Sequence, residues 1–312
     1  MLKIFVTAVI LVLVTSIQAQ TPRSVEDFQK RGEQRYTQGD YDGALSDFTR
    51  AVEMSSRLGV QSELRGNKWT AAEEAEKIRV VDPRTATAYV SRGVARLAKG
   101  DADGAVLDFN QALAISPGLI WAYYNRGTAW LAKGDTERAL ADYDKSLKLD
   151  SRFVDGYTGR GNARLDKGDV AGAFADYEQA IRLAPHNARV YDSRGDARRL
   201  TGDTEGALTD FERAMRLDPK FANPYYGRGM VRFHRRELEG AIADFTKVLS
   251  LDGRLALAYA NRGLAFLLQG REAEAERDLS RAVELAPGLR SRVEASAKAA
   301  KGQRRYKERS HF

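Results

Sequence analysis

The chain contains no cysteine among its 312 residues. Disulfide bonds, thiolate nucleophiles and zinc or iron–sulfur sites built on cysteine are therefore excluded. Lipoprotein anchoring is excluded as well, because that processing needs a cysteine. The absence leaves the compartment open, since an exported chain can do without disulfides where it buries enough apolar surface.

Histidine is also scarce. His186, His234 and His311 lie far apart, and none is at ligand spacing with a second histidine or a carboxylate pair. Zinc needs three or four convergent ligands, so we expect no metal site. The sequence also lacks a Ser-His-Asp arrangement, a phosphate-binding glycine loop and a glycine-rich nucleotide fingerprint. We therefore expect no catalytic residues, no cofactor and no small-molecule substrate, and we interpret the activity as binding.

Only one long apolar run is present, at the N-terminus. MLK gives a short positive start, IFVTAVILVLV is apolar apart from one threonine, and TSIQA ends in a small residue. This pattern predicts a secretory signal peptide over residues 1–19, cleaved after Ala19. The alternative is an uncleaved anchor, although the run is shorter than the roughly 20 residues that a membrane crossing needs. We expect a periplasmic or secreted protein.

Unbalanced charge is confined to the C-terminus. From Arg290 to Phe312 there are eight basic residues and two acidic ones, whereas residues 20–289 hold 41 of each sign. A nucleic-acid-binding body would show a persistent basic excess, so we expect no nucleic-acid partner. The tail suits a weak contact with an anionic surface, worth about 1 kcal/mol per basic residue near a charged membrane; a solvated tail is the alternative.

Internal repetition is the strongest signal in the chain. An Arg-Gly dipeptide ends at seven glycines, the last six of which are 34 residues apart: Gly32, Gly93, Gly127, Gly161, Gly195, Gly229 and Gly263. The longer first interval places an insertion near residues 57–83. Ala139, Tyr143 and Leu147 recur at a spacing of four, which predicts a helix with these side chains on one face. We therefore predict seven two-helix units over residues 20–289.

A glycine and a capping residue separate the two helices of each unit. Gly134 supplies the turn, and Asp135 is placed to accept hydrogen bonds from the free backbone N–H groups of the second helix. Gly-Asp stands at this place in five of the seven units, and Arg236-Glu237 is one departure.

The repeat resembles the tetratricopeptide repeat. An aromatic residue precedes the glycine, and an alanine and a second aromatic follow it twelve and sixteen residues later, as in Tyr123, Gly127, Ala139 and Tyr143. A further unit carries the pattern in Tyr191, Gly195, Ala207, Phe211, Ala214 and Pro219. The resemblance implies an all-α fold, a right-handed superhelical solenoid of antiparallel helix pairs whose first helices line an inner groove. The arginine before each glycine, Arg236-Glu237 and Leu279 depart from the family pattern.

Each of these arginines is followed sixteen residues later by an aspartate. The pairs are Arg31 and Asp47, Arg92 and Asp108, Arg126 and Asp142, Arg160 and Asp176, Arg194 and Asp210, Arg228 and Asp244, and Arg262 and Asp278. Seven copies at equal spacing cannot all be active sites, so we interpret them as a ladder of structural ion pairs. The spacing leaves open whether each arginine pairs within its unit or with a neighbour.

By the resemblance, one face of the first helices lines the groove, with residues three and four apart aligned on it. We predict that this face binds a peptide or protein partner through Trp121, Tyr124, Thr128, Asp155, Thr158, Asn162, Arg189, Asp192, Asp196, Asn223, Tyr226 and Met230. Aromatic, acidic and amide groups suit a partner with aromatic or basic side chains, and an ordinary solvated surface is the alternative. A carboxylate-ended chaperone tail is not expected, because its clamp needs lysine where Gln29, Val90, Tyr124, Thr158, Asp192, Tyr226 and Ala260 stand.

Two segments lie outside the repeat pattern. The insertion contains a predicted helix at Thr70–Val80, and it is either a degenerate repeat or a lengthened second helix with a loop. In residues 290–312, an apolar stripe that includes Val293 and Ala300 predicts a helix that caps the last unit. Beyond Gly302 we expect an unstructured basic tail. The sequence therefore predicts a non-catalytic scaffold; a tether to anionic envelope surfaces and an accessory subunit of an envelope enzyme are the alternatives.

Overall fold

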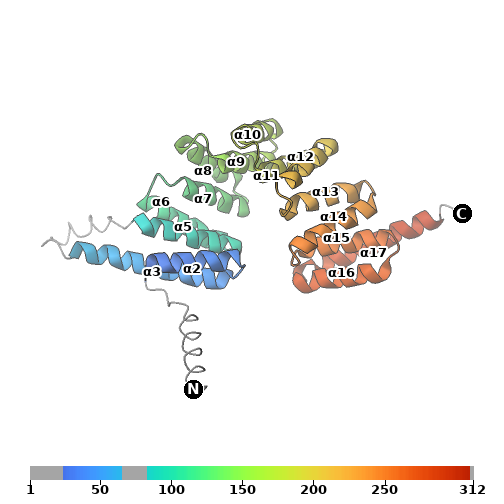
Figure 1. Ribbon diagram of the computed structural model, residues 1–312, viewed down its shortest axis with the longest axis horizontal. Coiled ribbons are helices and arrows are strands. Elements are labelled where there is room, and N and C mark those ends of the chain that lie inside the picture. The colour runs from blue at the N-terminus through green and yellow to red at the C-terminus, as the bar shows by residue number, and fades with distance from the viewer. Residues whose placement is uncertain (1–23, 65–82, 310–312) are drawn as a thin grey trace, which may run out of the picture. The chain divides into compact units, whose positions relative to one another are not determined.

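The structure is a computed structural model that describes residues 24–64 and 83–309 (Figure 1). Its described part is helical throughout and contains no strand, which confirms the all-α prediction. The predicted signal peptide with its cleavage site at Ala19, the predicted helix Thr70–Val80 and His311 lie outside the described residues. None of the described helices is both long and apolar enough to cross a membrane.

Contacts divide the chain into two compact units, Met1–Gly159 and Arg160–Phe312. The first unit contains α2 (Val25–Thr37), α3 (Tyr41–Leu64), α5 (Pro83–Ala98), α6 (Ala102–Ile115), α7 (Ile120–Ala132) and α8 (Thr136–Leu149). The unit boundary falls within α9 (Val154–Asp166). The second unit continues with α10 (Val170–Leu183), α11 (Ala188–Leu200), α12 (Thr204–Leu217), α13 (Ala222–His234), α14 (Leu238–Leu251), α15 (Ala256–Leu268), α16 (Glu272–Leu285), the 3₁₀ turn η1 (Pro287–Leu289) and α17 (Arg290–Arg309).

The predicted turn and cap between the two helices of a repeat are confirmed. Gly134 has a φ of 78°, a left-handed conformation that glycine adopts without steric cost. The Asp135 carboxylate accepts a hydrogen bond from the backbone N–H of Arg138 at 3.0 Å. Asp101, Asp169 and Asp203 cap α6, α10 and α12 in the same way. Because the connection is so short, it reverses the chain, and α7 packs directly against α8.

An aromatic ring of the second helix lies against a glycine of the first. A methyl group added at Gly127 would be 2.9 Å from Cε1 of Tyr143, closer than real side chains approach. Ala139, Tyr143 and Leu147 are all buried, as their spacing predicts. The glycine therefore lets the helix axes approach, and the ring fills the space between them.

The predicted ion-pair ladder is confirmed, and every pair forms within its own repeat. In the repeat of Arg194, Nε donates to one carboxylate oxygen of Asp210 at 2.9 Å and Nη2 donates to the other at 2.7 Å. Asp210 is only 2% exposed. A buried carboxylate held by two parallel hydrogen bonds fixes the register between the two helices, because Arg and Asp match in geometry as well as in charge.

A second arginine joins the ladder in five repeats, which the sequence analysis did not predict. Arg198 Nη1 donates to Asp210 at 2.8 Å and to the backbone oxygen of Gly206 at 3.2 Å. The equivalent ion pairs are Arg35 with Asp47, Arg96 with Asp108, Arg164 with Asp176 and Arg232 with Asp244. In the two remaining repeats an aromatic residue, Trp130 or Phe266, stands at this position.

The two segments outside the repeat pattern, the insertion and the C-terminus, both contain helix that the repeat pattern does not account for. The second helix α3 has 24 residues, whereas the later second helices such as α6 have 14, so α3 extends into the predicted insertion. At the C-terminus, α17 packs on α15, where Val293 clusters with Ala260 and Ala300 with Phe266. The expected break at Gly302 is wrong, because α17 continues to Arg309. A single glycine costs a helix only about 1 kcal/mol relative to alanine, and the residues after it are mostly good helix formers.

Candidate functional site

Two of the predicted binding residues of the first unit, Trp121 and Tyr124, lie in contact on α7. Trp121 is 53% exposed. Its ring packs edge-on against Phe153 at 4.8 Å and against Tyr124 at 5.7 Å between centroids. Tyr124 in turn contacts Phe153 and the buried Tyr143. The structure therefore brings Trp121 and Tyr124 together and fixes the tryptophan while much of its surface faces solvent.

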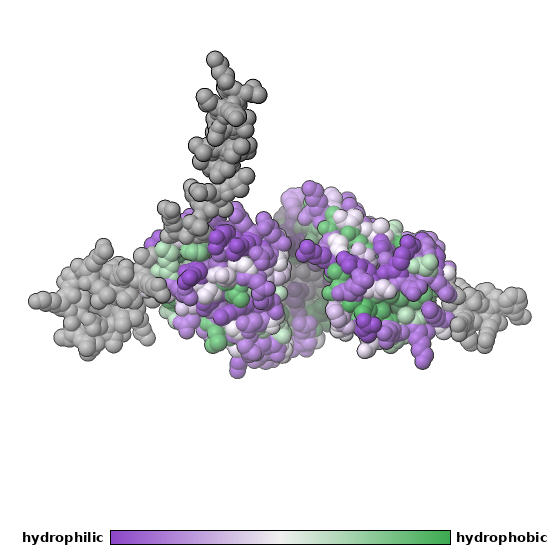
Figure 2. Space-filling model, turned by 90° about the horizontal axis from the view of Figure 1, so that it is seen from below, coloured by the Kyte–Doolittle hydropathy of each residue, from purple (hydrophilic) through white to green (hydrophobic). Residues whose placement is uncertain are grey.

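The face of the molecule seen in Figure 2 is mainly hydrophilic, with smaller hydrophobic areas. Few large hydrophobic side chains are exposed among the described residues. They include Leu107, Trp121 and Leu200. Single exposed aliphatic residues are normal on a protein surface, whereas a fixed aromatic ring with free surface has the properties of an interface anchor.

Two of the other predicted residues of the first unit, Thr128 and Thr158, are committed to local structure. Thr128 Oγ1 donates to the backbone oxygen of Tyr124 and lies within hydrogen-bond distance of Tyr143 Oη, both at 3.2 Å. Thr158 Oγ1 donates to the backbone oxygen of Val154 at 3.0 Å. Asp155 is half-buried on the same helix as Thr158. The two threonine side chains therefore support the helix face more than they project from it.

In the second unit, Asp192 on α11 is a buried acid without a complete set of partners. It is 7% exposed, and its Oδ1 atom has no hydrogen-bond partner among the described residues. The pKa of this carboxyl is raised to about 7, mainly by burial and also by the negative charge of Asp196, whereas a hydrogen bond from Asn223 opposes the shift. Asp196 itself accepts from Arg199 Nε at 3.0 Å. Asp192, Asp196 and Asn223 therefore form one acidic cluster.

Tyr226 and Met230 on α13 are brought together by a residue that the sequence analysis missed. Asn261 on α15 donates from Nδ2 to Tyr226 Oη at 2.8 Å and to Met230 Sδ at 3.3 Å. Burial is the main cause that raises the pKa of Tyr226 above its usual value. The available sequence signal was an asparagine directly before an Arg-Gly pair, which Asn125 shares.

Two predicted residues stand apart from these clusters. Asn162 is exposed, and its Oδ1 accepts a hydrogen bond from Tyr177 Oη at 2.7 Å. Arg189 is exposed at the start of α11, where its backbone N–H donates to the capping Asn187 at 3.0 Å. The unit boundary within α9 separates Asn162 from Asp155 and Thr158, with which it was predicted to share a helix face.

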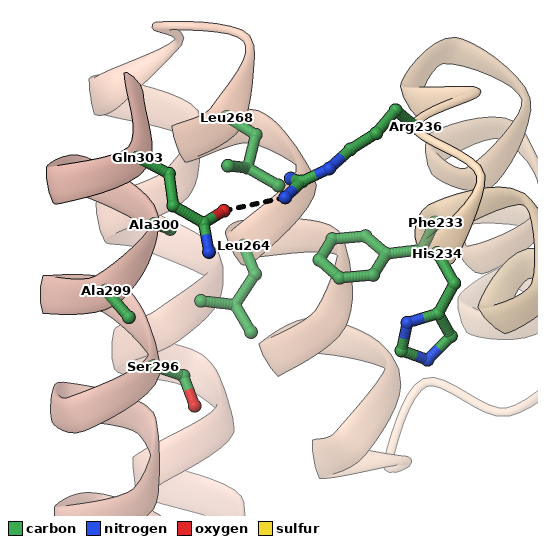
Figure 3. Close-up of a pocket in the computed structure, with 9 residues that line it drawn as sticks. All are labelled: Phe233, His234, Arg236, Leu264, Leu268, Ser296, Ala299, Ala300 and Gln303. Atoms are coloured by element: carbon green, nitrogen blue, oxygen red, sulfur yellow. Dashed lines mark hydrogen bonds between the residues drawn. The ribbon is translucent and has the colours of Figure 1, made fainter. Parts of the chain in front are cut away.

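A pocket of about 320 Å³ lies between α13, α15 and α17 (Figure 3). It was not predicted from the sequence. Its walls are formed by Phe233, His234, Arg236, Leu264, Leu268, Ser296, Ala299, Ala300 and Gln303. Arg236 Nη2 donates to Gln303 Oε1 at 2.7 Å across it. The signal that could have found the pocket was present, because Arg236-Glu237 replaces the usual Gly-Asp of the turn.

The described residues contain no cluster of three or more histidine, aspartate or glutamate side chains that converges as metal ligands would. His186 and His234 are both exposed. The ring of His234 lies 5.9 Å from that of Phe233. The chemistry that these surfaces offer is recognition by aromatic contact, by charge and by amide hydrogen bonds.

Family models match most of the chain. Models described as "Tetratricopeptide repeat" match residues 58–120, 120–153, 154–187 and 226–289, and one described as "TPR repeat" matches residues 195–234. No curated protein matches the chain.

Solved structures show the same architecture. Yeast Tom70 is 19% identical with a TM-score of 0.64, over 93% of this chain and 66% of that one. A tetratricopeptide repeat protein from Parabacteroides merdae ATCC 43184 is 19% identical with a TM-score of 0.60, over 89% of this chain and 99% of that one. The hetero-tetramer of the APC/C proteins Cut9 and Hcn1 gives 15% identity and a TM-score of 0.61, over 92% of this chain and 57% of that one. At these identities the similarity establishes the fold alone.

Proposed function

Because the chain belongs to the tetratricopeptide-repeat family, a family of protein-interaction scaffolds, we propose that it is a non-catalytic scaffold that binds peptide or protein partners on its first helices. The observation that carries the proposal is Trp121, a large aromatic side chain that is 53% exposed and fixed edge-on against Phe153. A ring held in one orientation loses little conformational freedom when a partner covers it, so more of the contact energy appears as affinity.

The acidic cluster of the second unit supports a partner with basic side chains. Asp192 is buried, and its Oδ1 has no hydrogen-bond partner in the part of the chain that the structure describes. An unpaired buried carboxylate gains more from a cation than an exposed one does. Asp196 and Asn223 flank it with further acceptors. Each unit has its own partner-binding face in this proposal: Trp121 and Tyr124 form that of the first unit, and Asp192, Asp196 and Asn223 form that of the second.

Affinity capture with matched variants tests this proposal. The full chain, Trp121→Ala, Asp192→Asn and Leu107→Ala are each used to capture partners from an extract of the native compartment. Leu107 is the matched control, because it is 63% exposed but lies on the second helix α6. We expect both changes on the first helices to reduce recovery of the same partner and Leu107→Ala to leave it unchanged. Equal recovery with all four proteins would remove the proposal.

We further propose that the protein acts outside the cytoplasm, in a periplasm or as a secreted protein. The support is the N-terminal sequence, in which a short basic start, an apolar run and a small residue at position 19 follow the order of a signal peptide. Mass spectrometry of the N-terminal peptide of the native protein tests this proposal. A mature chain that begins at Gln20 is expected, and a chain that retains Lys3 would contradict cleavage.

A second candidate function is attachment to an anionic surface through α17. Its described side chains include four exposed basic residues, Arg290, Arg292, Lys298 and Lys301, and one exposed acid, Glu294. Sedimentation with vesicles that contain an anionic lipid, compared with neutral vesicles, measures this contact. Salt-sensitive binding to the anionic vesicles alone is expected, and no binding to either kind would eliminate this candidate.

A further inference from the structure

Arg236 occupies a backbone conformation that the other repeats give to glycine. Its φ is 65°, and it is the one residue other than glycine with a positive φ among the described residues. At the equivalent turns the chain has Gly39, Gly100, Gly134, Gly168, Gly202 and Gly270, with φ between 78° and 90°. The left-handed conformation costs a residue with a side chain about 1 to 2 kcal/mol. This cost indicates that the arginine side chain has a use at this position.

The Arg236 side chain extends over the pocket between α13, α15 and α17. Figure 3 shows the guanidinium reaching toward Gln303, to which Nη2 donates at 2.7 Å. A guanidinium has five N–H donors in a planar fork. No other ion pair or hydrogen bond of the Arg236 guanidinium is present among the described residues. Most of its donors therefore have no partner in the part of the chain that the structure describes.

The rest of the pocket has an apolar base. Phe233, Leu264, Leu268 and Ala300 supply apolar surface, and the His234 ring points away from the Arg236 guanidinium. None of the lining residues is acidic. The volume of about 320 Å³ is enough for one large side chain and the group next to it.

Among the described side chains, neighbouring charges leave Arg236 as the cation of this pocket. Arg235, the preceding residue, donates to Glu205 at 2.6 Å, and Arg232 is paired with Asp244 at 2.8 Å. Glu237 follows in the chain but does not line the pocket. An anionic ligand therefore fits the charge of the pocket, and an apolar group fits its base.

We propose that this pocket binds a partner segment in which an acidic side chain follows a bulky apolar one. The apolar side chain packs on Phe233, Leu264 and Leu268, and the carboxylate takes the place of Gln303 as the partner of Arg236. Arginine and carboxylate form two parallel hydrogen bonds, which sets both position and direction. The site uses none of the residues of either partner-binding face, so the failure of one proposal leaves the other intact.

The test uses N-acetyl-Phe-Glu amide as the probe and follows the NMR signals of Gln303 and Leu268 in the full-length protein. Two matched probes, N-acetyl-Phe-Gln amide and N-acetyl-Ala-Glu amide, each lack one of the two groups. We expect the Phe-Glu probe to bind at least about tenfold more tightly than either control. Equal binding of the Phe-Gln probe, or no binding of the Phe-Glu probe at its solubility limit, would overturn the proposal.

Three variants separate ligand binding from a structural role of the hydrogen bond between Arg236 and Gln303, which we call the bridge. Arg236→Gly keeps the turn and removes the guanidinium, so it should weaken the Phe-Glu probe at least about tenfold. Gln303→Ala removes only the bridge, so it should bind the probe as well as the wild type or better. Arg235→Gln controls for the loss of one positive charge nearby and should bind normally. If Arg236→Gly binds normally, or if Gln303→Ala loses as much as Arg236→Gly, the carboxylate site does not exist.

Discussion

Arg160 holds Asp176 with two hydrogen bonds, from Nε at 2.9 Å and from Nη2 at 2.7 Å, across the two helices α9 and α10. Arg164 binds the same carboxylate through Nη1 at 2.7 Å. Asp176 is 3% exposed. Two cations therefore compensate one buried anion, and the same arrangement recurs in other repeats of the chain.

Replacing Asp176 by alanine should destabilise this part of the protein by about 3 to 5 kcal/mol, because it leaves two partly buried guanidinium groups without their carboxylate. Denaturant unfolding and hydrogen exchange of α9 and α10 measure the loss, since repeat proteins can open locally. Asp166→Ala is the control, because Asp166 is an exposed aspartate at the end of α9, the helix that packs against α10 in this repeat. A variant Asp176→Ala with unchanged stability would show that the ladder has no structural role.

The contact between Gly127 and Tyr143 predicts a second cost. Gly127→Ala would place a methyl group 2.9 Å from the tyrosine ring, so we expect a loss of about 1 to 3 kcal/mol from overpacking. Gly118→Ala is the matched change at a glycine with open space around it. In thermal unfolding, Gly127→Ala should have a clearly lower midpoint than Gly118→Ala. Similar midpoints would mean that the two helices accommodate the added methyl group at this contact without a loss of stability.

Arg236→Gly should stabilise the fold, which is unusual for the removal of a large side chain. The change relieves the left-handed conformation and loses one exposed hydrogen bond to Gln303. We expect a gain of about 1 kcal/mol in the free energy of unfolding, measured by urea denaturation. A loss of stability would show that the hydrogen bond to Gln303 stabilises the fold by more than the backbone strain at Arg236 destabilises it.

The raised pKa of Asp192 predicts that the effect of Asp192→Asn on stability depends on pH. Its pKa is about 7 in the folded chain and 3.8 as the reference value, so the folded state holds a proton that the unfolded state releases between these values. Asp192 therefore lowers stability progressively as the pH rises from about 4 to 7, at about 1.4 kcal/mol for each pKa unit. Asp192→Asn removes this penalty.

Unfolding of the wild type and of Asp192→Asn should be compared at pH 4 and pH 8. The variant should be more stable at pH 8 by an amount on the order of a few kcal/mol, and the difference should shrink at pH 4. Other titrating groups cancel because the two proteins share them. A difference in stability that is independent of pH would mean that burial does not raise the pKa of the Asp192 carboxyl.

The sequence predicted the repeated framework because each of its parts has a local cause. The spacing of Ala139 and Tyr143 defines a helix face, the pair Gly134 and Asp135 defines a turn and a cap, and each arginine recurs at a fixed distance from its aspartate. Seven copies made each pattern unambiguous. These features depend on residues within one repeat, which is why the fold was predictable.

The binding residues were harder to predict, because spacing tells which residues share a face but not which of them are already engaged. Thr128 and Thr158 lie on the predicted face but donate to the backbone of their own helices. Asp192 was expected to be one of several groove residues, and its pKa depends on its burial, on Asp196 and on Asn223 from the next repeat. The pocket beside Arg236 depends on α17, whose continuation past Gly302 was not expected.

Site-specific photo-crosslinking tests the central claim most directly, because it reports which face a partner touches in the native compartment. A photoreactive phenylalanine analogue is placed at Trp121 on the first helix α7 and, separately, at Leu107 on the second helix α6, both of which are exposed positions. We predict a crosslinked partner from position 121 and none from position 107. Crosslinks from position 107 alone, or equal crosslinks from both, would contradict the account.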